Sequence, residues 1–538
     1  MAKWWQERVV YQIYPRSYQD TNGDGIGDIP GIIMHLDELK DLGVGILWLS
    51  PVYCSPNADN GYDISDYRNI NPEYGTMQDM DTLLAEAGKR DIKIIMDLVI
   101  NHTSDRHEWF QKSKDKNSPY RDYYIWRPGK GGKAPNNWTG FFAGNCWEYD
   151  AQSGEYYLHL FTQNQPDLNY YNPKVLDEVK DIMRFWLDKG VSGFRCDVIN
   201  ILYKSSLEDG KKRLALTGIE YYLSQEGTHE ILRTLRREVL DHYDCFTVGE
   251  TVFITPQMGK DLCDRDRREL DMLFSFEHME TDQYFVKWFK RKFNPKMFGK
   301  TIAKWQNALE WNANYLENHD QTRSVSRFGD EGVYWAESAK MLGTLLLTLR
   351  GTPYIYEGQE IGMTNFDFTD MDQIQDIESH NVYRFAKKLH FTEKFIWKMM
   401  KACSRDNART PMQWNTGANA GFSTGKPWHK VNANFSRINM QSQINDPDSI
   451  RSYYKKLIAM RSQSNVLLSG DFQLVRTTRN VFIYDRTLEG KSLRVLLNFT
   501  GKPQKANCSG KVVISNYGRE EYDGVLKPYE AAVLDLIK

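Results

Sequence analysis

Acidic side chains that end short apolar segments are the residues of this sequence whose type and spacing could do chemistry. Asp197 and Glu250 each close an apolar run, and Asp320 follows a third one. A single acid in such a place is usually a helix cap or a solvated loop residue. Several of them at the ends of separate apolar runs favour a common site, because a half-buried carboxylate is costly unless it is paired or used.

Paired carboxylates, in a chain without a phosphate-binding glycine loop or a Cys–His pair, suggest glycoside chemistry. That chemistry needs one ionised carboxylate as nucleophile or base and one carboxylic acid that protonates the leaving oxygen. Arg195 stands two residues before Asp197, so on a strand both side chains point to one face and the guanidinium favours the ionised aspartate. Glu250 ends an apolar strand, where desolvation favours the protonated acid.

The composition excludes several classes of partner. Of 538 residues, 69 are Lys or Arg and 71 are Asp or Glu, so nothing in the charge balance points to nucleic acid or to an anionic membrane surface. The seven cysteines are scattered without a CxxC pair, and no segment resembles a signal peptide or a membrane span. We therefore expect a cytoplasmic monomer.

Short apolar runs alternate with amphipathic stretches along most of the chain, and near-continuous apolar runs are typical of buried parallel strands. Eight such runs predict a (β/α)8 TIM barrel, whose active site lies at the carboxyl ends of the strands. A doubly wound open sheet is the alternative, but no glycine-rich dinucleotide turn follows the first run. The predicted strands are residues 9–14, 44–50, 92–100, 191–198, 245–250, 272–276, 312–317 and 353–356. The predicted helices include residues 33–42, 77–90, 173–189 and 228–243.

Two stretches depart from this alternation. Residues 103–172 form a long, aromatic-rich connection after the third strand, whose rings we expect to wall a substrate site. After residue 462 the chain turns to short alternating strands with turn signals, which are typical of an antiparallel β-sandwich. The sequence thus predicts a barrel over 1–102 and 173–462, an inserted domain B over 103–172, and an all-β domain C over 463–538.

Segments at the strand ends carry a family resemblance. Residues 97–102 (DLVINH), 193–200 (GFRCDVIN), 247–250 (TVGE) and 317–320 (ENHD), with 165–169 (QPDLN), resemble the signature regions of the α-amylase family, glycoside hydrolase family 13. Residues 351–356 (GTPYIY) and 404–414 (SRDNARTPMQW) are similar to the oligo-1,6-glucosidase and α-glucosidase branch. The resemblance extends along nearly the whole chain.

The resemblance implies Asp197 as nucleophile, Glu250 as general acid/base and Asp320 as transition-state stabiliser of a retaining glucosidase. It also implies a group of residues that hold the non-reducing glucose: Asp59, Tyr62, His102, Phe161, Gln165, Arg195, His319 and Arg409. Retention through a covalent glucosyl-enzyme predicts that the two catalytic carboxyls lie about 5–5.5 Å apart.

The loop after the first strand places small residues between possible cation ligands, as loops that bind hard cations do. Its candidate ligands are Asp20, Asn22, Asp24, Ile26 and Asp28. The twelfth position is Gly31, so the bidentate Glu of an EF-hand is missing. Composition alone leaves a metal loop and an Asx-turn loop equally open, and the resemblance implies a structural Ca²⁺ or Mg²⁺.

The resemblance also indicates specificity. Val198 follows the nucleophile, and valine there accompanies α-1,6 activity in this branch, although a β-branched residue is common at any strand end. A walled pocket predicts exo action on isomaltose, isomaltotriose, sucrose or maltose. A sucrose isomerase shares the scaffold, but Gln321 follows Asp320 where such enzymes tend to carry Asn-Pro. A trehalose-6-phosphate hydrolase would need a phosphate clamp that the sequence does not display, and a non-catalytic member would lack the acids.

One segment departs from the family pattern. Residues 356–360 read YEGQE, whereas the family usually has Gln before this glycine and an acid after it. Glu357 and Gln359 are therefore exchanged around Gly358, and the hydrogen bonds of strand eight do not follow from the resemblance.

Overall fold

The structure is a computed structural model that describes residues 3–142, 144–213, 215–264 and 266–536. It divides into two compact units, each with its own strands and helices. Unit 1 comprises Met1–Leu47, Glu86–Ile92 and Phe276–Lys538. Unit 2 comprises Trp48–Ala85 and Lys93–Ser275.

Parallel strands form the centre of unit 2. β5 (Lys93–Leu98) pairs with β9 (Gly193–Cys196), β9 pairs with β10 (Phe246–Glu250), and β10 pairs with β11 (Met272–Phe274). Every residue of β9, β10 and β11 is buried, which explains why their sequences are largely apolar instead of alternating. The register sets Asp97 opposite Arg195, and Arg195 opposite Val248. The carboxyl ends of these strands therefore present their acids along one edge.

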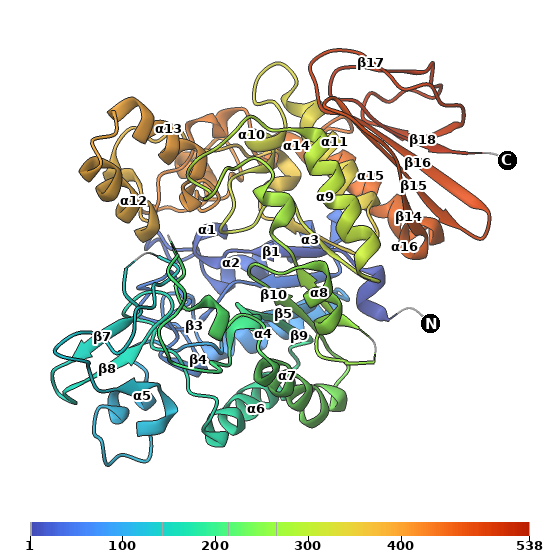
Figure 1. Cartoon of the computed structure of the whole chain (residues 1–538). Helices are drawn as coiled ribbons and strands as arrows, with labels where there is room; N and C mark the ends of the chain where they lie inside the picture. The colour runs from blue at the N-terminus through green and yellow to red at the C-terminus, as the bar shows by residue number, and fades with distance from the viewer. Residues whose placement is uncertain (1–2, 143, 214, 265, 537–538) are drawn as a thin grey trace. The chain divides into compact units, whose positions relative to one another are not determined.

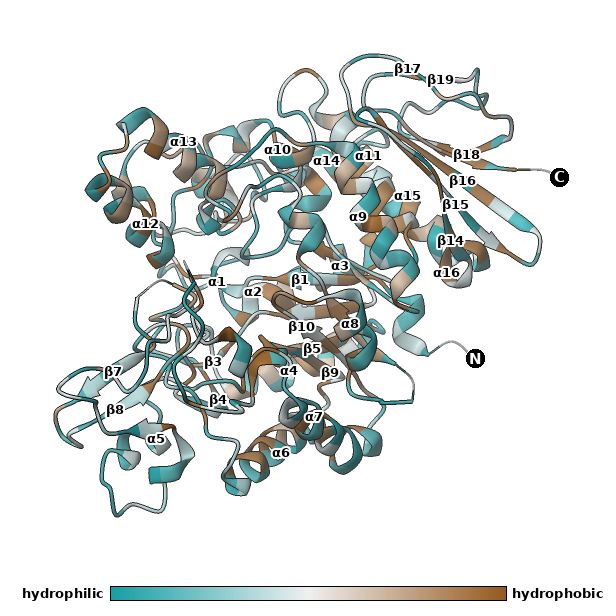
Figure 2. Cartoon of the chain, viewed as in Figure 1, coloured by the Kyte–Doolittle hydropathy of each residue, from teal (hydrophilic) through white to brown (hydrophobic). Residues whose placement is uncertain are grey.

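Two amphipathic helices of unit 2, α6 (Pro173–Asp188) and α7 (Glu226–Glu238), lie side by side (Figure 1). At the start of α6, the Asn172 side chain accepts the backbone N–H of Lys174, and Pro173 takes the first helical position. Buried residues recur every three or four positions along α6, so one stripe is apolar and the rest is polar. In Figure 2 the strands β5, β9 and β10 are largely brown, whereas α6 and α7 carry both teal and brown residues. The other helices of this unit are α5 (Glu108–Ser113) and α8 (Pro256–Cys263), while α4 (Met77–Lys89) crosses into unit 1.

The connection after β5 forms a small antiparallel sheet with the strand order β6-β8-β7. Its strands are β6 (Trp126–Arg127), β7 (Trp147–Asp150) and β8 (Glu155–Leu158). Trp138 and Trp147 are 0% and 3% exposed and belong to a hydrophobic core cluster. The expectation that the rings of this segment wall a substrate site is therefore wrong for these tryptophans, because a small sheet needs large side chains to fill its own core. Phe141, Phe142 and Phe161 remain only partly buried.

In unit 1 the first strand of the chain pairs with the last strand of the repeat. β1 (Val10–Ile13) pairs in parallel with β13 (Thr352–Tyr356), and β13 pairs with β12 (Ala313–Asn314). In both units neighbouring strands of the sheet follow one another in chain order. β1 and β13 are the first and the eighth strand of the predicted barrel, and their pairing closes a (β/α)8 barrel. An open doubly wound sheet lacks such a pairing. The predicted barrel is confirmed. The remaining strands near the start of the chain are β2 (Ile46–Leu49), β3 (Tyr53–Cys54) and β4 (Asp66–Ile70).

The end of the chain forms an antiparallel sandwich within unit 1, drawn in red in Figure 1. One sheet has the order β14-β15-β16-β20-β18, and a short β17–β19 pair forms the second. Ala506 and Leu526 from the short pair share a core cluster with Val481, Ile483 and Leu496 from the larger sheet, so the sheets pack face to face. The strands are β14 (Asp471–Thr477), β15 (Val481–Leu488), β16 (Lys491–Asn498), β17 (Gln504–Lys505), β18 (Lys511–Ser515), β19 (Val525–Leu526) and β20 (Ala531–Asp535). The predicted all-β ending is confirmed, whereas the exact boundaries of the three domains stay a prediction.

Some predicted elements differ from the observed ones. The helix expected at 33–42 is two helices, α2 (Ile29–Met34) and α3 (Leu36–Leu42), separated at His35. The helix expected at 228–243 ends at Glu238, and a 3-10 turn follows. Two further helices, α12 (Ile377–Lys388) and α13 (Glu393–Cys403), form a helical hairpin. The other helices of unit 1 are α1 (Pro15–Tyr18), α9 (Pro295–Ala308), α10 (Ser324–Phe328), α11 (Trp335–Thr348), α14 (Met440–Gln443), α15 (Ile450–Ser462) and α16 (Asn465–Ser469). Within the described ranges, every helix is too short or too polar to cross a membrane.

Candidate active site

One buried guanidinium joins the acids of unit 2. Arg195, on β9, is 1% exposed and lies 2.6 Å from Asp197 Oδ1 and 2.8 Å from Glu250 Oε1. Its Nη1 also lies 2.5 Å from Asp97 Oδ1 on the neighbouring strand β5. The predicted pairing of Arg195 with Asp197 is thus present, and the same side chain also holds Glu250. Asp197 and Glu250 therefore sit at the ends of adjacent strands on a shared cation.

The environment of Asp197 raises its pKa. Burial raises the pKa of Asp197 well above its ordinary value against the pull of Arg195, and the neighbouring Glu250 carboxyl raises it further. The sequence predicted only the effect of the guanidinium, which burial and the like charge outweigh. Two carboxyls that share one cation in a buried site hold their protons jointly. Such a pair can supply one carboxylate and one acid, which a retaining glycosidase requires.

The backbone after Asp197 is strained. Val198 has φ +36° and ψ +42°, a left-handed conformation that is a genuine outlier for a β-branched residue. Its N–H donates to Glu250 Oε2 at 3.3 Å. Strain of this kind costs about 1–3 kcal/mol and persists where the surrounding structure fixes the chain. The turn that follows Asp197 is therefore held in place by the carboxyl of Glu250.

Asp97 is a positioning residue that we did not include in the predicted set. It is fully buried, it binds Arg195, and its Oδ2 accepts the indole N–H of Trp48 at 2.8 Å. The hydroxyl of Tyr62 donates to the same oxygen at 3.4 Å. The faces of Trp48 and Tyr62 also lie 5.3 and 5.6 Å from the Arg195 guanidinium carbon. The signal was present in the sequence, because Asp97 lies near the end of β5 and opens the DLVINH segment.

The predicted glucose-binding residues of unit 2 form one connected group. Gln165 Nε2 lies 3.2 Å from Asp59 Oδ2 and 3.1 Å from His102 Nε2, and His102 Nε2 also lies 3.2 Å from the carbonyl of Tyr62. The ring of Phe161 lies 5.1 Å from that of His102. Burial lowers the pKa of His102, so its imidazole is neutral and can both donate and accept hydrogen bonds. Such a set can bind sugar hydroxyls.

Two buried acids fix the loops that carry this group. Asp63 accepts the backbone N–H groups of Ala58 and Asp59 at 2.9 and 3.0 Å, and burial raises the pKa of Asp63 to about 6 against those hydrogen bonds. Asp167, in the QPDLN segment, forms a buried ion pair of 2.7 Å with Lys204. Lys204 also donates to Asn101 Oδ1 at 2.9 Å. We missed Lys204, because its role depends on a contact between distant loops.

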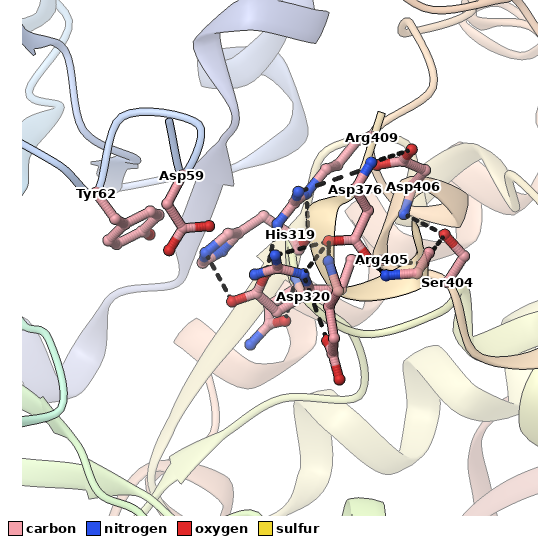
Figure 3. A network of polar contacts seen from close by, with 12 residues as sticks. Asp59, Tyr62, His319, Asp320, Asp376, Ser404, Arg405, Asp406 and Arg409 are labelled. Atoms are coloured by element: carbon pink, nitrogen blue, oxygen red, sulfur yellow. Dashed lines mark hydrogen bonds and ion pairs between the residues drawn. The ribbon is translucent and has the colours of Figure 1, made fainter. Parts of the chain in front are cut away.

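The remaining predicted residues form a second network in unit 1 (Figure 3). Asp320 Oδ1 lies 2.6 Å from Arg409 Nη2 and 3.2 Å from Arg405 Nη1, and Asp320 Oδ2 lies 3.3 Å from His319 Nε2. Burial favours the neutral acid, but the contacts with His319, Arg405 and Arg409 outweigh it and hold the pKa of Asp320 well below its ordinary value. His319 is fixed from its other side by Gln12, whose amide lies 2.8 Å from Nδ1. This network presents an ionised carboxylate.

Arg405 is another residue that the sequence did not single out. Its Nε and Nη2 lie 2.9 and 2.7 Å from Asp376 Oδ1, so the guanidinium joins Asp376 to Asp320. Asp376 is fully buried and also begins α12 by accepting the N–H groups of Glu378 and Ser379. Arg405 lies in the SRDNARTPMQW segment, so the signal was the motif itself. Asp376 has no such signal, because it belongs to the helical hairpin.

The predicted cation loop is ordered by Asx turns. Asp20 accepts the N–H groups of Asn22, Gly23 and Gly25, and Asp24 accepts that of Ile26. Asp28 begins α2 by accepting the N–H of Gly31. Among the described residues, no three His, Cys, Asp or Glu side chains converge as a metal-binding group. The geometry agrees with the Asx-turn alternative and leaves the predicted metal untested.

Known proteins resemble this chain along its whole length. Residues 12–470 match the family model "Alpha amylase, catalytic domain". The oligo-1,6-glucosidase of Parageobacillus thermoglucosidasius is 51% identical over 98% of this chain and 98% of its own, and that of Halalkalibacterium halodurans is 48% identical over 99% of both. The crystal structure of Bacillus licheniformis trehalose-6-phosphate hydrolase superposes with a TM-score of 0.96 at 44% identity and covers 100% of both chains. The trehalulose synthase of Pseudomonas mesoacidophila MX-45 has the same TM-score at 40% identity, over 99% of this chain and 100% of its own.

A barrel whose strands end in paired carboxyls on a guanidinium is the architecture of a glycoside hydrolase. The chain belongs to the α-amylase family, and the family resemblance found in its sequence is confirmed.

Proposed function

We propose that the protein is a retaining, exo-acting α-glucosidase that releases glucose from the non-reducing end of short oligosaccharides. The observation that carries the proposal is the guanidinium of Arg195, which holds Asp197 at 2.6 Å and Glu250 at 2.8 Å on adjacent strand ends. A nucleophile and an acid on a shared cation are the two groups that a retaining mechanism needs.

In the first step, Asp197 attacks the anomeric carbon while the bond from that carbon to the leaving oxygen breaks. Glu250 gives its proton to the departing oxygen, so the leaving group departs as a neutral alcohol. The nucleophile is then part of a glucosyl ester, and Glu250 is ionised. Asp320 would stabilise the positive charge that develops on the sugar ring, which its low pKa suits.

In the second step, water attacks the same carbon from the vacated side. Glu250 takes a proton from this water, and the ester bond to Asp197 breaks. The product is glucose with its original anomeric configuration, and both carboxyls return to their starting states. The hydroxyls of the glucose would be held by the predicted set, which comprises Asp59, Tyr62, His102, Phe161, Gln165, Arg195, His319 and Arg409.

The substrate proposal is isomaltose and isomaltotriose first, with sucrose and maltose as further substrates. It is supported by Val198 beside the nucleophile and by the oligo-1,6-glucosidases that are 51% and 48% identical to this chain. The trehalose-6-phosphate hydrolase and trehalulose synthase relatives are less similar, at 44% and 40%. The two alternatives are thus hydrolysis of trehalose 6-phosphate and isomerisation of sucrose.

A substrate panel with product identification tests the proposal. We expect glucose from isomaltose, isomaltotriose, sucrose and maltose, with the highest kcat/KM on the α-1,6 bond. Asp197→Asn should lower turnover by several orders of magnitude, because the amide cannot form the ester. Cleavage of internal bonds in a long α-glucan, disaccharide isomers as the main product from sucrose, or a strong preference for trehalose 6-phosphate would each reject the proposed activity.

We further propose that the loop from Asp20 to Asp28 holds a structural Ca²⁺ or Mg²⁺. Its donors are oxygens, which both ions prefer, and Asp24 Oδ1 and Asp28 Oδ1 each accept one N–H and keep a second lone pair for a cation. Asn22 and the carbonyl of Ile26 would complete the set. The melting temperature should fall in EDTA and recover with Ca²⁺ or Mg²⁺, and Asp24→Asn should weaken the recovery. A melting temperature that EDTA does not change would leave the Asx-turn loop as the explanation.

A cytoplasmic monomer remains part of the proposal. It is supported by the seven cysteines, all of which are free thiols in the described residues. Cell fractionation and light scattering would test the location and the oligomeric state.

A further inference from the structure

Phe253 is an exposed aromatic residue in an unusual backbone conformation close to the proposed acid. It stands three residues after Glu250, in the turn between β10 and α8, and 52% of it is exposed. Its φ is +50°, a region that glycine adopts freely and that a phenylalanine rarely enters. A large apolar side chain at such a position has a strained backbone and leaves apolar surface in water. Both features are unfavourable, so we looked for a function of Phe253.

The turn that carries Phe253 is rigid. Asn200 donates to the carbonyl of Val252 at 2.9 Å and accepts the N–H of Val252 at 3.0 Å. The hydroxyl of Thr251 donates to the carbonyl of Phe274 at 2.8 Å, and the side chain of Thr255 begins α8 by accepting the N–H of Met258. These contacts fix the chain on both sides of Phe253, so the ring is presented from a defined backbone.

Phe253 is the exposed end of a row of aromatic rings. Its ring stacks on Phe141 at 6.3 Å and 21°, and Phe141 stacks on Phe161 at 4.8 Å and 9°. Phe161 in turn contacts His102 at 5.1 Å. Phe141, Phe161 and Val252 pack against the cluster that contains Val198, which follows Asp197. The row therefore leads from a proposed glucose-binding residue, past the nucleophile's neighbour, to solvent.

The position of the acid indicates which part of a substrate this row meets. A general acid protonates the oxygen of the leaving group, so it lies against the leaving group and not against the glucose that stays on the enzyme. Phe253 follows Glu250 by three residues in a turn that hydrogen bonds hold on both sides, so its exposed ring stands on a segment continuous with the acid. Sugars present apolar C–H faces that aromatic rings bind, and an exposed ring beyond the acid suits a leaving sugar.

We propose that Phe253, supported by Phe141 and Phe161, is a platform that binds the leaving-group sugars of the oligosaccharide. The inference rests on the proposed glucosidase activity and assigns the recognition of the second and third sugar units. It makes Phe253 a determinant of leaving-group preference with no part in bond cleavage.

The test compares two substrates that share the glucose and differ in the leaving group. Isomaltotriose has a disaccharide leaving group, whereas α-glucosyl fluoride has none that could reach the platform. The readout is the ratio of their kcat/KM values in Phe253→Gly, Phe253→Trp and the unsubstituted enzyme. Tyr149→Ala is the matched control, because Tyr149 is also 52% exposed, lies in the same unit and contacts a neighbouring ring, that of Tyr156, at 5.2 Å.

In Phe253→Gly the ratio should fall about 3- to 10-fold, as expected for the loss of one aromatic contact. Phe253→Trp should restore it to within about 2-fold, and Tyr149→Ala should leave it at the value of the unsubstituted enzyme. The melting temperature of Phe253→Gly should equal or exceed that of the unsubstituted enzyme, since glycine relieves the strained φ. An unchanged ratio in Phe253→Gly, or an equal fall in Tyr149→Ala, would overturn the platform. If the unsubstituted protein hydrolyses neither substrate, the proposed activity itself fails.

Discussion

Replacing Glu250 with glutamine separates the two roles that the structure gives this residue. The amide keeps the shape of the side chain, and its oxygen can still accept from Arg195, which lies 2.8 Å from Glu250 Oε1. The substitution removes the proton that protonated Glu250 gives in the first step, and it removes the negative charge that ionised Glu250 places beside Asp197. Each loss has its own measurable consequence, so one variant tests both.

The loss of the proton should matter only where the leaving group needs one. A positioned general acid contributes about 10²–10⁴-fold, so kcat/KM on isomaltose should fall by that factor in Glu250→Gln. Fluoride leaves without protonation, so α-glucosyl fluoride should still form the glucosyl ester on Asp197. The second step lacks its base and becomes slow, and the glucosyl-enzyme should accumulate.

The loss of the charge should move the pH profile. Burial raises the pKa of Asp197 against the pull of Arg195, and the Glu250 carboxyl raises it further. Attack needs the ionised aspartate, so the rate is lost as the pH falls through this pKa. Removing the like charge lowers the pKa, and the acid limb of ester formation from α-glucosyl fluoride should shift to lower pH in Glu250→Gln.

Intact-protein mass spectrometry after rapid quenching detects the ester, and stopped-flow fluoride release gives the rate of its formation. Asp197→Asn is the control and should form none. Equal losses on isomaltose and on α-glucosyl fluoride, with no accumulated ester, would refute the assignment of Glu250 as the acid. An acid limb that stays in place or moves upward would refute the electrostatic coupling of the two carboxyls.

Three further perturbations test the scaffold. Asp376→Ala leaves Arg405 without its buried partner and should destabilise the protein by about 3–5 kcal/mol in urea unfolding, with the exposed Asp372→Ala as control. Because the pKa of Asp376 is lowered by Arg405 and Arg409 against burial, its stabilisation should be present above the ordinary pKa of an aspartate and lost as the pH falls. Arg486→Met removes the guanidinium that donates to the buried carbonyls of Thr348 and Gly470, and it should lower the free energy of unfolding by about 2–4 kcal/mol. The control is Arg476→Met at an exposed position of the neighbouring strand, which should leave the free energy of unfolding almost unchanged. The double exchange Glu357→Gln with Gln359→Glu should keep the melting temperature within a few degrees, and a large loss would show that the order of these residues matters.

The barrel was predictable because its strands are buried on both faces. Such strands appear in the sequence as continuous apolar runs, and eight of these runs predicted the repeated strand and helix units of the barrel. Their ends were less predictable: the run expected at 312–317 pairs only at Ala313–Asn314. A ladder ends where backbone geometry diverges, and hydrophobicity does not record that. The helix break at His35 was missed for a similar reason, since no glycine or proline marks it.

The site followed from the sequence wherever a motif carried it. Asp197, Glu250 and Arg195 were placed together because their spacing on adjacent strands fixes their neighbours. Asp376 and Lys204 were missed because each acts across distant segments that no local pattern connects. The conformations of Val198 and Phe253 were invisible as well, since neither residue type predicts a positive φ. Backbone strain arises only when the chain folds, so Val198 and Phe253 were recognised as strained only in the structure.

The exchanged pair in strand eight shows which parts of a motif are physically fixed. Glu357 Oε2 accepts the N–H of Tyr14 at 2.8 Å, and Gln359 Oε1 accepts the N–H of Tyr356 at 3.1 Å. Each position therefore needs one acceptor oxygen, which a carboxyl and an amide both provide. Burial raises the pKa of Glu357 well above its ordinary value, which favours the neutral acid, and a neutral acid resembles an amide in charge. Gly358 has no such freedom, because its φ is +82° and a Cβ there would lie 2.3 Å from Met363 Sδ. The turn thus requires the glycine and two acceptors, and either order of acid and amide satisfies it.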